Sequence, residues 1–294
     1  MSIVITGASG NLARAVTRLL LDKHGVAPRD LLLVTRSPER LSDIAERGAQ
    51  VRQGDFDRPD ELPAAFAGGE RVLLISADRL GVRIRQHTAA VNAAKAAGVR
   101  HIAYTSYVNT DVKGNPSAIA PEHLATERAI RDAGLAYTFL RNSIYAEVQA
   151  PDAAAASATG RLVTNAGDGR CAYVSRDDCA AVAAVVLAEG ATHENTIYEV
   201  TGPELLDAPA LAALYAEVGA RPVEPVLVDD AAFAQGLVEH AGMPQAVAES
   251  YATFGAAIRG GFLDVRTDVV ERLTGRAPRR LGEVLEQHAA AARM

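Results

Sequence analysis

The sequence has little cysteine. Its two cysteines, Cys171 and Cys179, form no C-x-x-C pair, which fits a reducing compartment. We expect both to behave as small buried hydrophobic side chains. The seven histidines are scattered without the spacing of zinc ligands, so the sequence predicts no metal site.

Long apolar runs and an excess of basic charge are also missing. No stretch approaches about 18 uninterrupted apolar residues, and no basic region precedes the first apolar run, so we expect neither a membrane span nor a signal peptide. The net charge of −6 and the pI near 5.7 argue against a general nucleic-acid binder and give no sign of affinity for an anionic membrane. We expect a cytoplasmic protein.

Lysine is rare as well. The three lysines are Lys23, Lys95 and Lys113, and none lies four residues after a tyrosine. A lysine at that spacing lowers the pKa of the tyrosine, which then exchanges a proton with a carbonyl group. Tyr137 is followed four residues later by Arg141, which does not deprotonate and falls at the end of a predicted strand. The sequence therefore excludes this tyrosine–lysine apparatus of carbonyl reduction.

What the sequence does contain begins with a strand, a glycine turn and a helix. Residues 2–6 form a short apolar run, residues 7–13 read Gly-Ala-Ser-Gly-Asn-Leu-Ala, and apolar residues follow at helical spacing. Gly7 lets the chain turn off the strand, Gly10 lets the backbone approach a pyrophosphate, and Ala13 lets the helix lie against the strand. The predicted cofactor contacts in this turn are Gly7, Ala8, Ser9, Gly10, Asn11 and Leu12. The unit predicts dinucleotide binding; the simpler alternative is a turn that only connects strand to helix.

Apolar runs of strand length recur along the first half of the chain. They cover residues 31–35, 49–53, 71–76, 99–106 and 136–141, with helices expected near 39–47, 59–66, 82–97 and 121–133. Alternating strands and helices in units of about 20 to 30 residues predict an α/β fold with a Rossmann-like doubly wound parallel sheet. Ligands bind at the carboxyl ends of the strands in such sheets, so residues at these ends should share one cleft.

The second predicted strand ends where NAD enzymes carry an acidic residue for the ribose. Here Arg36 stands between Thr35 and Ser37, which favours the 2′-phosphate of NADP, with NAD as the alternative. The simpler interpretation of Arg36 is a solvated loop residue. Asp55 follows the third strand and is placed to bond an adenine amino group, while Asp57 is expected to cap the next helix. The remaining predicted cofactor contacts at the strand ends are Phe56, Ser76, Ser106 and Tyr107.

The pattern loosens after residue 145. We expect a strand over 170–174, a helix over 176–188 and a strand over 196–200 at the edge of the main sheet, and then mostly helices. The later elements are helices over 207–218, 229–242, 245–258 and 280–292, and a strand over 223–228. These patterns predict an NAD(P)-binding Rossmann-like domain over 1–145, to which roughly 170–200 return, and a smaller, mainly helical substrate-binding lobe over 201–294.

Several longer segments resemble the NmrA-like branch of atypical short-chain dehydrogenases/reductases, in particular its NADPH-dependent quinone oxidoreductases. The segments that carry the resemblance are residues 5–13, 51–55, 73–76, 92–99, 102–106, 122–127, 140–145 and 166–170. The resemblance covers most of the chain and implies a Rossmann-like domain, NADPH and a small hydrophobic acceptor. This branch generally lacks the tyrosine–lysine pair too.

A quinone accepts a hydride readily, and its reduced oxygens take protons from water, so positioning and hydrogen bonds to the developing oxyanion would suffice. The predicted catalytic residues are Tyr145 and Asn142, which follow the sixth strand, and His123, which would donate a proton near neutral pH. The alternatives are packing roles for Tyr145 and Tyr107, a backbone-capping role for Asn142 and a solvated helix position for His123.

The first functional hypothesis is an NADPH-dependent oxidoreductase that transfers a hydride to a quinone or related aromatic carbonyl compound, without flavin or metal. A second hypothesis is a non-catalytic NAD(P)-binding redox sensor, which the missing tyrosine–lysine pair favours. A third is a tailoring reductase or oxygenase of a polycyclic aromatic metabolite. We expect a small aromatic substrate as the partner, and neither nucleic acid nor membrane; the sequence leaves the oligomeric state open, a homodimer included.

Overall fold

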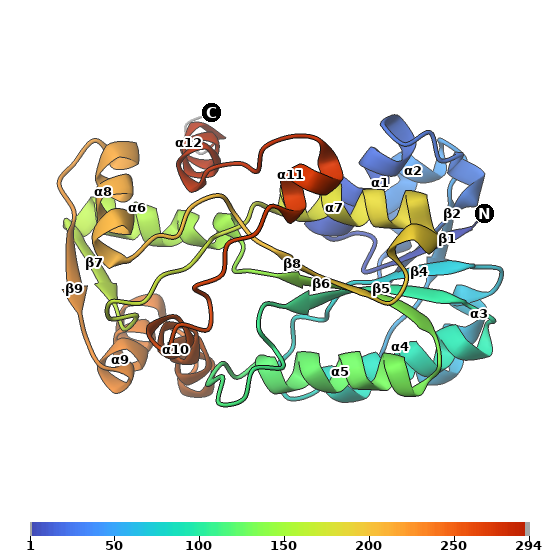
Figure 1. The fold of residues 1–294 in the computed structure, drawn as a ribbon, viewed down its shortest axis with the longest axis horizontal. Helices are drawn as coiled ribbons and strands as arrows, with labels where there is room; N and C mark the ends of the chain where they lie inside the picture. Colours follow the sequence, from blue (N-terminus) through green and yellow to red (C-terminus); the bar gives the residue numbers. More distant parts are fainter. Residues whose placement is uncertain (1, 292–294) are drawn as a thin grey trace. The chain divides into compact units, whose positions relative to one another are not determined.

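The computed structural model describes residues 2–291, and its main feature is a seven-stranded sheet of order β3-β2-β1-β4-β5-β6-β8 (Figure 1). The strands of this sheet are β1 (Ile3–Thr6), β2 (Leu31–Thr35), β3 (Gln50–Gln53), β4 (Arg71–Leu74), β5 (His101–Tyr107), β6 (Ala136–Asn142) and β8 (Thr196–Val200). A second sheet pairs β7 (Arg161–Thr164) with β9 (Glu224–Leu227) in parallel. The helices are α1 (Asn11–Asp22), α2 (Ser42–Ala45), α3 (Leu62–Phe66), α4 (Arg83–Ala96), α5 (Ala120–Asp132), α6 (Gln149–Thr159), α7 (Arg176–Glu189), α8 (Ala208–Gly219), α9 (Asp230–Ala241), α10 (Gln245–Arg259), α11 (Val269–Thr274) and α12 (Leu281–Ala291).

The sheet is wound in two directions from β1. β1 pairs in parallel with β2 on one side and with β4 on the other, β2 pairs with β3, and β4 pairs with β5. Every residue of β1, β2 and β5 is buried, as expected for strands covered on both faces. The predicted doubly wound fold is therefore confirmed, and its switch point lies between β1 and β4. The predicted edge position of β8 is also confirmed.

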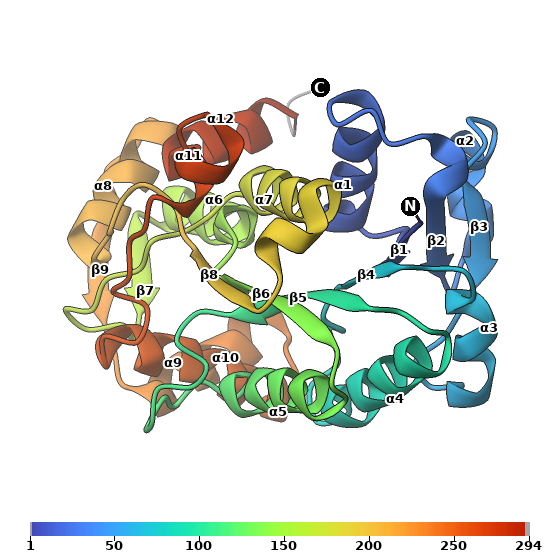
Figure 2. The same ribbon diagram turned by 45° about the vertical axis from the view of Figure 1, so that its right-hand side comes forward.

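Helices cover both faces of this sheet (Figures 1 and 2). Helices α1 and α7 lie on one face, and α3, α4 and α5 lie on the other. Helix α1 begins at the glycine turn and buries one stripe, Leu12, Ala13, Val16, Thr17 and Leu20. On the opposite face, residues of α3 and α4 pack with β1, β2, β4 and β5 in one apolar cluster that includes Phe66, Tyr104 and Phe139. The predicted strands and helices thus form a core that holds the strand ends in place.

Two predicted helices begin as tighter turns. The helix expected near 39–47 is a 3₁₀ turn, Pro38–Leu41, followed by the short α2. The helix expected near 59–66 likewise starts with a 3₁₀ turn, Pro59–Glu61, before α3. In both places proline lacks an N–H and fixes φ, which suits a short tight segment at a helix start.

The chain forms two compact units. Unit 1 contains residues 1–107, 122–141 and 177–198, and unit 2 contains residues 108–121, 142–176 and 199–294. Residues 177–198 group with the first strands, whereas 108–121 and 142–176 group with the C-terminal part. The domain bounds given in the sequence analysis stay a prediction. The assignment of substrate binding to residues 201–294 stays a prediction.

Unit 2 contains elements that the sequence pattern did not indicate. These elements are helices α6 and α11 and strand β7, which were not predicted. Helix α6 was missed because it is rich in alanine and shows no apolar periodicity. The strand expected over 170–174 is wrong: Cys171 and Val174 form two isolated bridges, with Leu206 and Tyr145. Residues 170–174 therefore contribute no strand, and the two-stranded sheet of unit 2 consists of β7 and β9.

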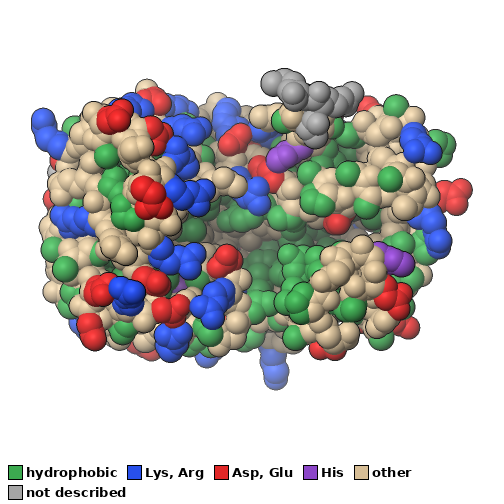
Figure 3. Space-filling model, turned by 180° about the vertical axis from the view of Figure 1, so that it is seen from behind, with side chains coloured by type: hydrophobic (Ala, Val, Ile, Leu, Met, Phe, Trp, Pro, Cys, Tyr) green, Lys and Arg blue, Asp and Glu red, His purple; other side chains and the backbone are tan. Residues whose placement is uncertain are grey.

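Acidic and basic side chains are interspersed on the face that Figure 3 shows. Within residues 2–291, no helix is long and apolar enough to cross a membrane. Both cysteines are buried, as predicted.

Candidate functional site

The glycine turn has the geometry of a phosphate cradle. Gly7 adopts φ +59°, a left-handed conformation that favours glycine, and its carbonyl accepts a hydrogen bond of 2.8 Å from the Gly10 N–H. A Cβ on Gly10 would lie 3.1 Å from this carbonyl oxygen. Gly7, Gly10 and Asn11 are exposed, and neither a capping side chain nor an acidic residue occupies the first turn of α1. The first N–H groups of α1 therefore face outward, as an anionic pyrophosphate requires.

Hydroxyl groups connect this turn to the end of β2. The Ser9 and Thr35 hydroxyls lie 2.9 Å apart, and Thr35 Oγ1 also accepts a bond of 3.2 Å from the Ser37 N–H. The Ala8 N–H donates to the Val34 carbonyl. These contacts fix the backbone on both sides of Arg36, which is exposed. The backbone of a basic residue is thus fixed next to the phosphate cradle.

The end of β3 differs in part from its prediction. The Asp55 carboxylate accepts a bond of 3.0 Å from the Asp57 N–H, which sets the turn after the strand. Asp57 does not cap the next helix: its carboxylate accepts bonds from Arg85, Gln86 and Arg79, and the residue before the 3₁₀ turn is Arg58. The hydrogen bond from Arg85, and to a smaller extent that from Gln86, lowers the pKa of Asp57.

Phe56 packs against the unit 1 core and meets the His87 ring edge-on at 6.3 Å between centroids. It is half-buried, so part of the ring remains at the surface beside Asp55. Ser76 follows β4, and its N–H donates to Thr105 Oγ1 at 2.8 Å. Phe56 and Ser76 therefore lie on well-held backbone beyond the ends of their strands.

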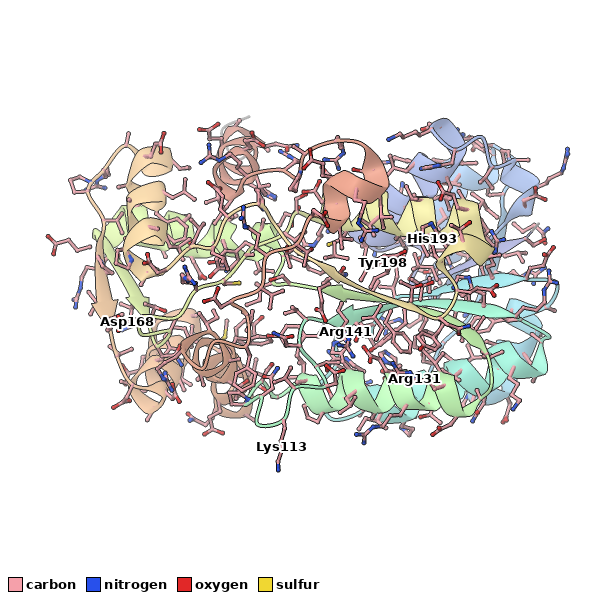
Figure 4. All side chains as sticks on the ribbon, in the orientation of Figure 1. Lys113, Arg131, Arg141, Asp168, His193 and Tyr198 are labelled. Atoms are coloured by element: carbon pink, nitrogen blue, oxygen red, sulfur yellow. The ribbon has the colours of Figure 1, made fainter. Side chains whose placement is uncertain are left out.

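Ser106 belongs to a buried polar cluster with Glu127 and Arg141. Its hydroxyl donates to Glu127 Oε1 at 2.7 Å, and Arg141 binds both oxygens of that carboxylate, with Nε–Oε1 2.8 Å and Nη2–Oε2 2.7 Å. The Glu127 side chain is 0% exposed and that of Arg141 is 5% exposed. Figure 4 shows Arg141 between α5 and the sheet. Because the Ser106 hydroxyl donates its hydrogen to Glu127, the Ser106 oxygen can only accept hydrogen bonds from other groups.

His123 is buried in the first part of α5, not solvated. Its Nδ1 lies 2.7 Å from the Tyr104 hydroxyl, and its ring is tilted against that of Tyr107, 6.1 Å between centroids. Burial, and then the positive charge of Arg83 and the electrostatic interaction with His87, lower its pKa well below the ordinary value. The imidazole is therefore neutral at pH 7, which does not fit the predicted proton donor with an ordinary pKa.

Asn142 and Tyr145 are brought together in unit 2. Asn142 Nδ2 donates to the Tyr145 hydroxyl oxygen at 3.3 Å, and the Arg176 guanidinium lies 5.3 Å from the centre of the Tyr145 ring. The Glu147 carboxylate accepts a hydrogen bond of 2.9 Å from the backbone N–H of Arg176 and lies 4.0 Å from its guanidinium. Within the described chain, Asn142 Oδ1 is buried without a hydrogen-bond partner. An orphaned oxygen of this kind calls for an N–H donor such as a carboxamide.

Sequence reasoning missed the partners of these residues. Glu127, Arg141, Tyr104 and His87 were not singled out for any role in a site. Arg141 carries a charge in the buried part of β6, after Phe139 and Leu140, and a charged residue in such a strand signals a buried ion pair. Within residues 2–291, no three His, Cys, Asp or Glu side chains gather closely enough to hold a metal ion.

The family model described as NAD(P)H-binding matches residues 7–190, which include the glycine turn, Arg36 and the ends of β3 to β6. The chain belongs to this family. Its relatives place it in the NmrA-like branch, as the resemblance predicts: an NmrA-like family domain-containing oxidoreductase of Aspergillus flavus is 28% identical over 285 residues and covers 95% of this chain and 92% of its own. This NAD(P)H-binding protein is an NAD(P)H-dependent oxidoreductase and takes NADP(H) as its cofactor.

Three further comparisons extend over nearly the full length. Quinone oxidoreductase 2 of Escherichia coli is 37% identical over 283 residues, 96% of each chain. The crystal structure of the Escherichia coli NADPH-dependent quinone oxidoreductase complexed with NADPH superposes with a TM-score of 0.91 and covers 98% of this chain and 99% of its own. The triphenylmethane reductase of Citrobacter sp. complexed with NADP(H) gives a TM-score of 0.89 at 36% identity, covering 97% and 99%.

Proposed function

We propose that this oxidoreductase transfers a hydride from NADPH to a quinone or a related conjugated aromatic compound, without flavin or metal. The observation that carries the proposal is the full-length likeness to a quinone oxidoreductase in a chain without the tyrosine–lysine pair. A second relative also supports a conjugated acceptor: an NAD(P)H azoreductase of Xenophilus azovorans is 27% identical over 289 residues, and an azo dye is a conjugated aromatic compound.

The reaction needs no acid of its own. NADPH supplies a hydride, which adds to the quinone; one proton from water completes the hydroquinone, and NADP⁺ remains. The protein's contribution is to hold the two rings together, exclude water and donate hydrogen bonds to the oxygen that gains charge. This is why a chain without the carbonyl-reduction pair is suited to a quinone.

The residues at the carboxyl ends of the strands fit NADPH. The exposed amides at the start of α1 would bind the pyrophosphate, and Arg36 would pair with the 2′-phosphate. Ser9 and Asn11 lie beside the amides that would bind the pyrophosphate. Asp55 and Phe56 would contact the adenine. Ser76 and Ser106, at the ends of β4 and β5, would line the rest of the cofactor site.

The pair Asn142 and Tyr145 supplies polar groups for the acceptor. The Tyr145 oxygen accepts a hydrogen bond of 3.3 Å from Asn142 Nδ2, which orients the phenol. Arg176 over the ring stabilises negative charge on the phenol side. We assign Tyr145 to the acceptor oxygen and Asn142 to holding Tyr145 and the cofactor's carboxamide.

The test is turnover with purified protein, NADPH and a panel of benzoquinones, naphthoquinones and azo dyes, followed by the loss of reduced-nicotinamide absorbance. We expect quinone-dependent oxidation of NADPH, reduced about tenfold to a hundredfold in kcat by Tyr145→Phe. The control is Tyr251→Phe, an exposed tyrosine of α10. Protein that binds NADPH but reduces no member of the panel would overturn the proposal.

A further inference from the structure

Four side chains of unit 1 form a continuous hydrogen-bonded path, which we call the histidine relay: His87, Thr126, Tyr104 and His123. It begins at the Ala77 N–H in the segment after β4, which donates to His87 Nε2 at 2.9 Å. It continues through the buried side chains of α4, β5 and α5 and ends at His123. All four side chains are less than 5% exposed.

The donor and acceptor at each step follow from the chemistry of the groups. A backbone N–H can only donate, so His87 Nε2 is an acceptor and the neutral ring carries its hydrogen on Nδ1. His87 Nδ1 lies 2.9 Å from Thr126 Oγ1, which donates its own hydrogen to the Glu122 carbonyl at 2.9 Å. His87 therefore donates to Thr126, and its N–H also faces the Tyr104 hydroxyl at 3.4 Å.

The Tyr104 hydroxyl connects His87 to His123. The Tyr104 oxygen lies 3.4 Å from His87 Nδ1 and 2.7 Å from His123 Nδ1. With the His87 N–H directed at this oxygen, we infer that Tyr104 donates its hydrogen to His123 Nδ1. Burial raises the pKa of Tyr104 and lowers the pKa of His87 to about 3, so both remain in the neutral forms that the relay needs. His123 Nδ1 is thus an acceptor, and the hydrogen of its neutral ring is on Nε2.

We propose that His123 presents a neutral Nε2–H donor to the oxygen of the hydride acceptor, and that Tyr104 and His87 are positioning residues that fix this tautomer. The inference rests on the proposed function for the identity of the acceptor. Its place in the fold supports it, because His123 packs against Tyr107, the last residue of β5, where ligands of such sheets bind.

A neutral imidazole suits this role better than an imidazolium. It stabilises the developing oxyanion with a hydrogen bond and keeps its own hydrogen, so the proton of the product still comes from water. The surroundings favour the neutral form: Arg83 of α4 is buried nearby in an ion pair with Glu122 of α5, at 2.7 Å, and adds positive charge. Glu127, also of α5, is paired with Arg141 and Ser106 rather than with His123.

The first test reads the tautomer directly, without turnover. Nitrogen NMR of the ¹⁵N-imidazole groups in the intact protein, with the His123 signal assigned by its loss in His123→Gln, distinguishes Nε2–H from Nδ1–H. We expect His123 to be Nε2–H and unchanged between about pH 6 and 8. A cationic ring or an Nδ1–H ring in this range would overturn the relay. In Tyr104→Phe, which keeps the aromatic ring, we expect a mixture of the two tautomers.

The second test separates a donor from a packing residue. His123→Gln places an amide N–H near the position of Nε2, whereas His123→Leu has no donor. We expect kcat to fall about a hundredfold in His123→Leu and by less than about tenfold in His123→Gln, with the Kd for NADPH unchanged in both. Equal losses in the two variants would contradict the donor role.

A matched control exists in the same unit. The Tyr198 hydroxyl lies 2.8 Å from His193 Nδ1, the same type of bond at the far end of α7, and Figure 4 labels both residues. We expect Tyr104→Phe to lower kcat about tenfold and Tyr198→Phe to leave it unchanged. If the wild-type protein reduces no acceptor, the proposed function fails while the NMR result still decides the relay.

Discussion

At the scale of single residues, the NADP(H) site of this protein depends more on backbone groups than on side chains. Gly7 and Gly10 are needed for a left-handed turn and for a close approach between backbone atoms. Both features expose the amides of α1, and Arg36 follows Thr35, whose hydroxyl lies 2.9 Å from that of Ser9 in the turn. Selectivity between NADPH and NADH should therefore reside largely in this one side chain.

Replacement of Arg36 tests that selectivity. A guanidinium bound to a phosphate contributes about 1.5 to 3 kcal/mol, so Arg36→Ala should raise the KM for NADPH about tenfold to a hundredfold and leave that for NADH nearly unchanged. Steady-state kinetics with both cofactors provide the measurement, and Arg18→Ala, an exposed arginine of α1, is the control. Equal effects on the two cofactors would show that Arg36 does not bind the 2′-phosphate.

At the scale of elements, the segment between β7 and α7 is attached to the end of α10 within unit 2. Asn165 is buried, and its Nδ2 donates to the Ala252 carbonyl and to Asp230, each at 2.7 Å. Gly169 lies so close to α10 that a Cβ would be 2.1 Å from the Ile258 carbonyl oxygen. The glycine–aspartate–glycine turn of this family thus has a structural role in this chain.

Replacing Gly169 by alanine tests this contact, and replacing Gly236 by alanine provides a control whose free energy of unfolding should change in the opposite direction. Gly169→Ala should destabilise the protein by about 2 kcal/mol or more, because backbone atoms would have to move. Gly236→Ala lies inside α9 with open space around the new methyl group, and should stabilise by up to about 1 kcal/mol. Urea unfolding of both variants gives the two free energies. A Gly169→Ala protein as stable as the wild type would show that the segment adjusts freely.

The success of sequence reasoning varied with the kind of element. Strand β2 is a continuous apolar run, and helix α1 has apolar residues at helical spacing; both signals are strong, and both elements were predicted. Helix α6 was missed because alanine fits a core, a surface or a helix equally well. Of the predicted site residues, Asn142 and Tyr145 proved to be in contact, and His123 proved to be buried; the roles of all three remain predictions.

At the scale of the whole molecule, buried histidines make the stability depend on pH. Burial lowers the pKa of His87 to about 3 and that of His101 to about 4, and it also lowers the pKa of His123 well below its ordinary value. The unfolded chain binds these protons near pH 6.5, whereas the folded chain does not. The stabilisation is therefore complete above about pH 6.5 and is lost as the pH falls toward 4.

Unfolding at several pH values tests this dependence. Between about pH 6.5 and 4, His101→Gln should lose less stability than the wild type on acidification, by up to about 1.4 kcal/mol per pH unit. Glutamine preserves a donor to Thr138, which lies 2.9 Å from His101 Nε2. The control His240→Gln changes an exposed histidine and should follow the wild-type curve. If His101→Gln gives that same curve, His101 is protonated in the folded state.

The sequence by itself determined the glycine turn, the series of strands, the NADP(H) cofactor and the missing tyrosine–lysine pair, because each depends on residues close together in the chain. The tertiary structure decided which polar groups are neutral and which are paired. His123 and Glu127 stand four residues apart on one helix, yet one is bonded to Tyr104 and the other to Ser106 and Arg141. Burial and long-range hydrogen bonds set these states, and neither can be read from local spacing.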